Sequence, residues 1–509
     1  MRPETPARIL ALIFFCLFGL RPISAQEASA PSLPDAWELQ AENLTRLGMR
    51  FWRVPGCAVA VVHDGKVIWA KGFGTTALGG DQPVTPDTLF PVASITKSFT
   101  TTRMAQLVDA GKVGWDDPIV RHLPWFQLSD PLATRSVTLR NAASHSGGLA
   151  SHDLLWYRWG GTMRDRVERL KTIPVQSKPG EKFAYQTSLF TCLGLVEEAV
   201  EGKPWAEQVQ GALIDPLAMR STWSDPAKIP PQIIRAQPHR LDQEDLPQAC
   251  DPYPLTSPDP AGSIHSTAND LARWVLFHLG DGTTPEGKRL VSSDQMRLLH
   301  TQQVAQEFTP VLRGLNPSSQ SMGYALGFTV YDHRGEKVLA HGGAVDGMRA
   351  QITLVPGKKL GFVVLCNLSL TRMNLSLTHH LVDLFLGHTG RDYNGLVLKQ
   401  QKRGLEELLE RARVAGNRAR SRMDKIDPAR MEGIFVHPAY GEAKLFLRDG
   451  VPMFSLGGTE TTLQPMGPGC WLAQADPFGG AVIEYIPGDP PVVKLTGDVE
   501  LTLTRKNQP

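Results

Sequence analysis

Apolar positions recur at two different spacings along this chain, and each spacing predicts a different element. Residues 33–53 carry apolar side chains at helical spacing, which predicts an amphipathic helix. Residues 57–63 form a short continuous apolar run, Asp64-Gly65 is typical of a tight turn, and residues 66–70 predict the returning strand. We therefore expect the folded part to begin with a helix and an antiparallel hairpin.

Helical spacing dominates the middle of the chain, and strand-like runs return near residue 324. Helices are predicted at residues 188–201, 205–214, 271–277 and 377–386, and strands at residues 324–331, 338–341, 350–355 and 360–366. Strands from both ends of the sequence must then meet in one sheet, with a helical segment inserted between them. This order predicts an α+β fold in which helices flank an antiparallel sheet.

The last part of the chain changes character twice. Residues 391–427 are rich in Lys and Arg interleaved with Glu, which favours a solvated linker helix over a site for a partner or an anionic lipid. Short apolar runs separated by turns follow, and they predict a small separate β domain at residues 428–509. Residues 26–390 are expected to form the main domain.

Residues 1–25 have the pattern of a secretory signal peptide. Arg2 and Arg8 give a positive start, residues 9–20 are apolar, and residues 23–25 (Ile-Ser-Ala) fit a cleavage site. We therefore expect a periplasmic or secreted protein, a retained anchor being the alternative. No transmembrane segment is expected in the mature chain, because no later run is long and apolar enough.

The cysteines leave two alternatives open. They stand at positions 16, 57, 192, 250, 366 and 470, and removal of the leader would leave an odd number. The spacing contains no Cys-x-x-Cys pair, so a zinc site is not expected. The thiols are interpreted as small buried apolar groups, or as partners in one or two disulfides whose pairing the sequence does not give.

Composition and charge narrow the range of partners. Hydrophobic residues make up 42% and charged residues 20% of the 509 positions, as in ordinary globular proteins. The formal net charge is +2, and no basic run is interleaved with aromatics, so nucleic acid is not an expected partner. We expect a small-molecule or peptide substrate, and the oligomeric state is left open.

Ser94 and Lys97 are the first candidates for chemistry. They stand where a loop gives way to a helix expected at residues 96–110, and three residues is nearly one helical turn, so both side chains share a face. A serine hydroxyl needs a neighbouring base, and a lysine amine can serve where burial or positive charge lowers its pKa from about 10.4. Ser94 is the only serine with a lysine three positions on.

Other motifs join this pair. Tyr185 follows a glycine turn and precedes a helix, and a phenol close to a lysine can share its proton. His341-Gly342-Gly343 is expected at the end of a strand, where two glycines would let a substrate approach the backbone and the Ala344 amide could bind an oxyanion. A glycine hairpin is the alternative interpretation. The loop at residues 145–149 (His-Ser-Gly-Gly-Leu) is expected to shape the cleft.

Other catalytic schemes find no support in the sequence. It contains no Gly-x-Ser-x-Gly elbow, no His-Glu-x-x-His metal motif and no phosphate-binding Gly-x-x-x-x-Gly-Lys-Ser/Thr loop. The adjacent histidines His379 and His380 would point in different directions on a helix. We therefore expect neither a metal nor an organic cofactor.

Taken in order, these motifs resemble those of the serine β-lactamase and penicillin-binding-protein-like hydrolases, especially the class C and esterase-like branch. The resemblance covers residues 33–390 and rests on residues 89–97, 145–149, 185, 216–219, 260–270 and 341–343. It implies the β-lactamase-like fold, Ser94 as the acylated nucleophile, Lys97 and Tyr185 as proton-handling partners, and an oxyanion hole from the amides of Ser94 and Ala344. The tail resembles the β-barrel-like domain often fused to such hydrolases.

Two departures from the family pattern shape the predicted function. Thr187 stands where the family's Tyr-x-Asn motif has an amide, and His341 replaces the lysine of Lys-Thr-Gly, so a permanent charge for a substrate carboxylate is missing. The predicted function is an exported serine hydrolase that acts through an acyl-enzyme on an ester or amide, like an esterase or a D-aminopeptidase. The alternatives are a D,D-peptidase or β-lactamase, and a non-catalytic penicillin-binding-like scaffold protein.

Overall fold

The computed structural model describes residues 33–242, 244–255, 258–423, 431–474, 478–497 and 500–506. The signal peptide expected at residues 1–25 lies outside the described residues. Among the helices of the described part, none combines the length and the apolar composition needed to span a membrane.

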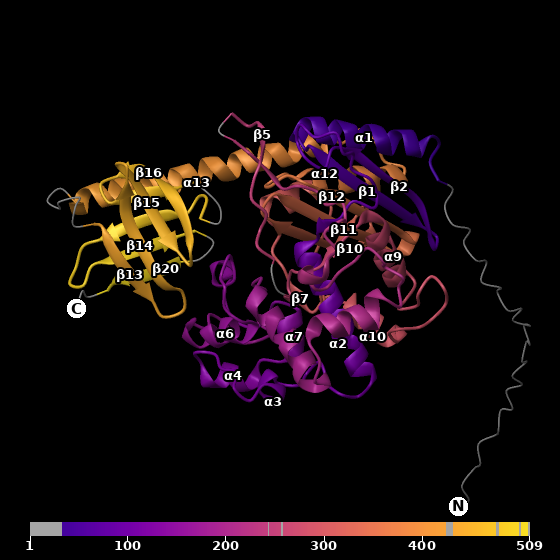
Figure 1. The fold of residues 1–509 in the computed structure, drawn as a ribbon, viewed down its shortest axis with the longest axis horizontal. Coiled ribbons are helices and arrows are strands. Elements are labelled where there is room, and N and C mark those ends of the chain that lie inside the picture. Colours follow the sequence, from indigo (N-terminus) through magenta and orange to yellow (C-terminus); the bar gives the residue numbers. More distant parts are fainter. Residues whose placement is uncertain are drawn as a thin grey trace, which may run out of the picture. The chain divides into compact units, whose positions relative to one another are not determined.

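An eight-stranded antiparallel sheet organises the main domain, in the order β2-β1-β12-β11-β10-β9-β8-β7 (Figure 1). Its strands are β1 (Gly56–His63), β2 (Lys66–Gly74), β7 (Val304–Ala305), β8 (Met322–Tyr324), β9 (Thr329–His333), β10 (Glu336–Val345), β11 (Met348–Val355) and β12 (Leu360–Cys366). Strand β1 lies beside β12, with Cys57 opposite Cys366. The predicted meeting of strands from both ends of the sequence is confirmed.

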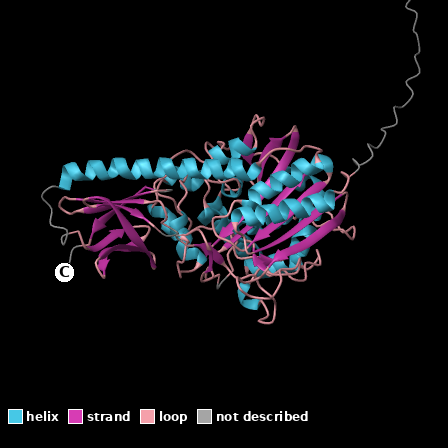
Figure 2. Ribbon diagram, turned by 90° about the horizontal axis from the view of Figure 1, so that it is seen from above, coloured by secondary structure: helices cyan, strands magenta, loops and turns pink. Residues whose placement is uncertain are grey.

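Helices cover both faces of this sheet, as Figure 2 shows with helices in cyan and strands in magenta. The covering helices are α1 (Trp37–Trp52), α12 (Met373–Phe385) and α9 (Ala268–Leu279). In β1, Val59 and Val61 belong to the core cluster that includes α1 and α12, whereas Ala58 and Ala60 belong to the cluster that includes α9. Strand side chains alternate between faces, so a strand covered on both sides needs the continuous apolar run seen in the sequence.

The inserted helical segment surrounds α2 (Thr96–Asp109), which is buried on almost all sides. The other helices between β2 and β8, besides α9, are α3 (Ile119–His122), α4 (Pro131–Ser136), α5 (Leu139–Ala143), α6 (Met163–Glu168), α7 (Thr187–Glu201), α8 (Trp205–Val209), α10 (Ser293–Leu299) and α11 (Pro310–Leu315). Helix α2 packs against α7, α8 and α10. The helix expected at residues 96–110 is confirmed. Because several helices pack against α2, the side chains on its first turn are held in fixed positions.

Two predicted elements differ from the structure. Residues 324–331 are not one strand, because β8 ends at Tyr324 and the chain turns back into β9 with Tyr324 paired to Thr329. Gly327 makes this turn with φ of +90°, and a Cβ there would lie 2.6 Å from Oγ1 of Thr101 in α2. The helix expected at residues 205–214 is α-helical only to Val209 and continues as a π-helical turn, Gln210–Ile214.

The C-terminal part consists of a long helix and a closed antiparallel barrel. Helix α13 spans Tyr393–Met423, and the barrel closes because β13 pairs with β20 as well as with β14. The barrel strands are β13 (Gly433–His437), β14 (Gly441–Arg448), β15 (Val451–Leu456), β16 (Thr459–Gly467), β17 (Cys470–Ala473), β18 (Val482–Ile486), β19 (Val492–Thr496) and β20 (Glu500–Arg505). The predicted small β domain is therefore an eight-stranded barrel without free edges.

Candidate active site

Ser94 lies in a single 3₁₀ turn, Ala93–Ile95, that leads directly into α2. Ala93, just before it, has φ of +47°, a left-handed conformation that is uncommon for alanine. The Nζ atom of Lys97, on the first turn of α2, donates to Oγ of Ser94 over 3.1 Å. The three-residue spacing thus brings the amine and the hydroxyl into direct contact.

Lys97 is completely buried, although lysine is almost never buried without partners. Its Nζ atom also donates to the carbonyl oxygen of Ala261 over 2.8 Å. The rings of Tyr185 and Phe190 lie close by, with their centroids 5.0 Å and 5.6 Å from Nζ. The amine therefore donates to two oxygen acceptors and faces two aromatic rings.

Tyr185 is held beside Lys97 by His145, which contacts both neighbours of the tyrosine. The amide of Ala184 donates to the carbonyl of His145 over 2.8 Å, and the amide of Gln186 donates to Nδ1 of the imidazole over 3.0 Å. Burial, together with the positive charge of Lys97, holds the pKa of His145 well below its usual value. The ring is therefore neutral at pH 7, which leaves Nδ1 free to accept.

Strand β10 brings the predicted glycines to the nucleophile. Its register with β9 ends at Ala340, whereas its register with β11 continues to Val345, so residues 341–345 extend beyond β9. A Cβ on Gly343 would lie 2.1 Å from the carbonyl oxygen of Val92, so only glycine allows this approach. His341 is thus not at the end of a strand, and the chain turns only after Val345.

His341 itself is turned into the protein. Its Nε2 atom lies 2.8 Å from the hydroxyl of Tyr324, and its Nδ1 atom 2.8 Å from the carbonyl of Gly342. Burial raises the pKa of Tyr324, so its phenol donates to Nε2, and Nδ1–H donates to Gly342. Burial and the charge of Lys97 lower the pKa of His341 to about 3. The imidazole therefore carries no charge at neutral pH.

A cavity of about 210 Å³ opens at the nucleophile. Of the predicted site residues, Ser94, Lys97, Thr187 and Ala344 line it, whereas Tyr185, His341, Gly342 and Gly343 lie outside its lining. The hydroxyl of Thr187, at the start of α7, donates to a carboxylate oxygen of Asp153 over 3.3 Å. The structure thus assembles the predicted set around one cavity, with four members on its wall and the others behind or beside it.

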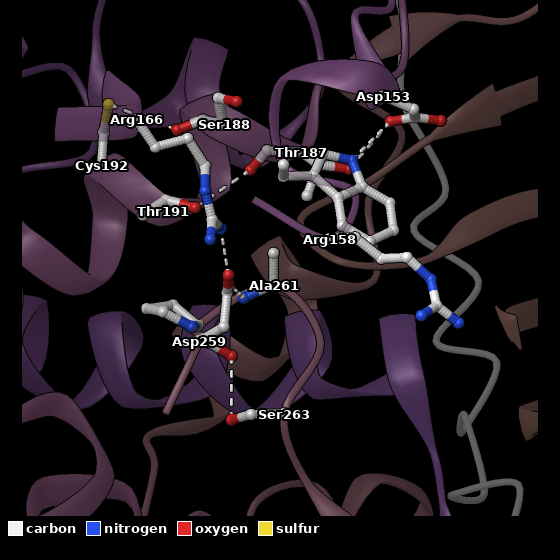
Figure 3. Close-up of polar contacts among 12 residues, drawn as sticks. Asp153, Arg158, Arg166, Thr187, Ser188, Thr191, Cys192, Asp259, Ala261 and Ser263 are labelled. Atoms are coloured by element: carbon white, nitrogen blue, oxygen red, sulfur yellow. Dashed lines mark hydrogen bonds and ion pairs between the residues drawn. The ribbon is translucent and has the colours of Figure 1, made fainter. Parts of the chain in front are cut away.

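Several cavity residues were not predicted from the sequence. Trp156, Trp159 and Tyr253 form an aromatic wall, and Arg166 and Asp259 face each other as an ion pair (Figure 3). These residues lie in loops and a short helix with no distinctive spacing, so nothing in the sequence identifies them.

The two arginines at the cavity wall are each paired with a carboxylate. Arg166 pairs with Asp259, and Nη2 of Arg158 lies 2.6 Å from Asp346, whose two carboxylate oxygens also accept from the Tyr157 hydroxyl. The cavity wall therefore presents these paired arginines and aromatic surface to a ligand, together with Lys97 beside the nucleophile.

Comparisons with known proteins show the family of the chain. A family model described as "Beta-lactamase" matches residues 44–384. The chain is 26% identical over 377 residues to the unguisins hydrolase ungD of Aspergillus violaceofuscus, and the match covers 68% of this chain and 64% of that protein's length.

Solved structures show the same fold. An octameric penicillin-binding protein homologue from Pyrococcus abyssi superposes with a TM-score of 0.62 at 20% identity, and the match covers 92% of this chain and all of that one. A D-amino acid amidase from Ochrobactrum anthropi superposes with a TM-score of 0.56 at 20% identity, over 68% of this chain and 99% of the amidase.

Proposed function

Because the chain belongs to the β-lactamase family of serine hydrolases, we propose that it cleaves an ester or amide through an acyl-enzyme on Ser94. The observation that carries the proposal is the 3.1 Å contact between Nζ of Lys97 and Oγ of Ser94 at the wall of the cavity. A nucleophile and its base within hydrogen-bond reach are the signature of covalent catalysis by serine.

In the proposed reaction, Oγ of Ser94 attacks the substrate carbonyl while its proton passes to the amine of Lys97, which acts as the base. The amides of Ser94 and Ala344 bind the oxyanion that forms. The bond to the leaving group then breaks, and the leaving group takes a proton that Lys97 and the Tyr185 phenol relay. Water repeats the sequence on the acyl-enzyme, which releases a carboxylic acid and restores the Ser94 hydroxyl.

The wall of the cavity favours a neutral acyl group with an aromatic or bulky apolar side chain. Trp156, Trp159 and Tyr253 offer apolar surface, and the two arginines of the wall are already paired with carboxylates. The neutral His341 offers no cation to a substrate carboxylate, which argues against efficient turnover of β-lactams. An arylalkyl ester fits these features, whereas the amide of an aromatic D-amino acid shares the aromatic side chain but carries an α-amino group that is largely protonated at pH 7. The pattern of residues 1–25 supports a periplasmic or secreted location.

The test compares Ser94→Ala with Ser318→Ala, a variant at an exposed serine between α11 and β8. Both proteins are assayed on p-nitrophenyl phenylacetate, p-nitrophenyl acetate, D-phenylalanine amide and a chromogenic cephalosporin. We expect Ser318→Ala to keep wild-type activity and Ser94→Ala to lose it. Full activity of Ser94→Ala would contradict the proposal, and fastest turnover of the cephalosporin would favour a β-lactamase.

A further inference from the structure

Arg166 and Asp259 form an ion pair at the cavity wall that the catalytic steps above do not use. Their side chains are only 10% and 17% exposed, and the guanidinium of Arg166 points directly at the carboxylate of Asp259 (Figure 3). Arg166 comes from α6 and Asp259 from the loop before β6 (His265–Ser266), 93 positions later. Taking two charges out of water is costly, so a pair kept in this position calls for an explanation.

Asp259 also shapes the loop that supplies a partner to Lys97. One carboxylate oxygen accepts from the amide of Ala261 over 2.8 Å, and the main-chain carbonyl of Asp259 accepts from the amides of Gly262 and Ser263 over 3.0 Å and 3.1 Å. These bonds fix the turn in which the carbonyl of Ala261 accepts from Nζ of Lys97. A continuous chain of contacts therefore runs from Arg166 through Asp259 and Ala261 to Lys97.

We propose that Asp259 and Arg166 are positioning residues that set the position and the protonation state of the Lys97 amine. Asp259 holds the Ala261 carbonyl against the amine and adds a negative charge that stabilises the ammonium form, while Arg166 holds Asp259 in place and offsets part of that charge. The inference rests on the proposed function, in which Lys97 is the base.

The ionisation of Asp259 agrees with this arrangement. Burial alone would raise the pKa of its carboxyl, but the charge of Arg166, the amide of Ala261 and the charge of Lys97 outweigh burial and hold it below the usual value. Asp259 is therefore a carboxylate at neutral pH.

The two histidines that interact with the charge of Lys97 are uncharged at neutral pH. His145 and His341 both have pKa values lowered by burial and by the charge of Lys97, and Tyr185 presents its ring to Nζ. Removal of the negative charge of Asp259 should therefore favour the neutral form of the Lys97 amine. Removal of the positive charge of Arg166 should favour the ammonium form.

The test is the acid limb of the pH profile of kcat/KM, which reports protonation of the base in the free enzyme. Asp259→Asn keeps an oxygen that can accept from the Ala261 amide but removes the charge, so we expect the limb to move to lower pH by about one unit. Arg166→Gln leaves the carboxylate uncompensated, so the limb should move to higher pH. Arg166→Lys should restore a limb close to that of the wild type.

Opposite shifts cannot come from a general loss of structure, which would lower kcat/KM at every pH. Thermal unfolding of each variant monitors the fold, and the double variant Asp259→Asn with Arg166→Gln should place the limb between those of the single variants. The inference would be overturned if the acid limbs of Asp259→Asn and Arg166→Gln stayed at the wild-type pH, or if both moved in the same direction. If Ser94→Ala were also fully active, the proposed function itself would fail.

A second inference rests on a different observation, the facing thiols of Cys57 and Cys366. Both side chains are fully buried, and their Sγ atoms lie 3.9 Å apart across β1 and β12. The amide of Asn367 donates to the carbonyl of Gly56, so Gly56 and Asn367, next to the two cysteines, form a hydrogen-bonded pair of the β1–β12 ladder. Cys57 and Cys366 are then a non-hydrogen-bonded pair, whose Cα atoms approach to about 4.5 Å, within the range of a disulfide.

We infer that these two cysteines are joined in a disulfide when the chain folds in an oxidising compartment. Both thiols are fully buried in the folded protein, and burial raises the pKa of the Cys57 thiol, so the bond must form before β12 closes on β1. The two thiols give up two electrons and two protons to a disulfide oxidant, which is reduced to two thiols. The new bond would link strands 309 positions apart.

The test refolds the denatured full chain in a mixture of oxidised and reduced glutathione. We expect the intact mass to fall by two hydrogens, a peptide map to join the segments of Cys57 and Cys366, and Tm to rise by about 5 °C. Cys57→Ser should abolish these changes, and Cys192→Ser, at another buried cysteine, should not. Two free thiols at positions 57 and 366 after refolding, or a bond to a different cysteine, would overturn the inference.

Discussion

The imidazole of His145 and the phenol ring of Tyr185 lie against each other, with centroids 4.0 Å apart and planes inclined by 33°. The same imidazole accepts from the amide that follows Tyr185, and the His145 carbonyl accepts from the amide that precedes it. A residue 40 positions earlier in the chain therefore fixes the tyrosine on both sides. This relationship gives the first prediction.

His145→Phe keeps an aromatic ring in the pocket but removes the acceptor for the Gln186 amide. A buried donor left without a partner costs about 1–3 kcal/mol, so we expect kcat/KM to fall by about 10- to 100-fold as Tyr185 loses its position. Steady-state kinetics with a p-nitrophenyl ester checks this. Unchanged kcat/KM in a folded variant would show that His145 does not position Tyr185.

Tyr185→Phe removes only the phenolic oxygen. If the phenol relays a proton, kcat should fall by about 10²- to 10⁴-fold while the fold is kept. Tyr485→Phe, in β18 of the barrel, is the matched control and should retain wild-type kcat. A kcat of Tyr185→Phe within a factor of two of the control would remove the tyrosine from the proton path.

Gly343→Ala and Gly342→Ala separate the two glycines of β10. At position 343 the new Cβ would lie 2.1 Å from the Val92 carbonyl, so β10 or the turn that carries Ser94 must move. At position 342 the atom nearest to the new Cβ would be Oε1 of Gln351 at 3.1 Å, and this oxygen lies at the end of a flexible side chain. We expect Gly343→Ala to lose at least about 100-fold in kcat/KM, as misplacement by about 1 Å does, and Gly342→Ala to stay close to wild type. Equal effects of the two substitutions would contradict this placement of β10.

How much the sequence could predict depends on the distance between the residues concerned. The hairpin of β1 and β2 and the Ser94–Lys97 contact follow from local periodicity and from spacing within one helical turn, and both are seen. The β8–β9 turn was missed because Gly327 is required by its contact with α2, which a local apolar run does not reveal. The pairing of Arg166 with Asp259 joins helix α6 to a loop 93 positions later, so no local pattern predicts it.

Stability should fall in weak acid because several histidines are neutral in the folded protein. Burial lowers the pKa to about 3 or 4 at five of them: His152, His265, His300, His341 and His379. The unfolded chain binds protons at these positions below about pH 6.5, whereas the folded chain does not, so the free energy of unfolding decreases as pH falls from about 6.5 towards 3. Urea midpoints measured at pH 7.5, 6 and 5 should decrease in that order, and a constant midpoint would contradict these pKa values.

The central claim is that Ser94 carries the acyl group during turnover. The most direct measurement is intact-mass analysis of enzyme quenched in acid within its first turnovers of p-nitrophenyl phenylacetate, followed by peptide mapping of the adduct. We predict a mass increase equal to the acyl group, located on Ser94 and absent from Ser94→Ala. An adduct on another residue, or turnover that continues in Ser94→Ala, would contradict the account.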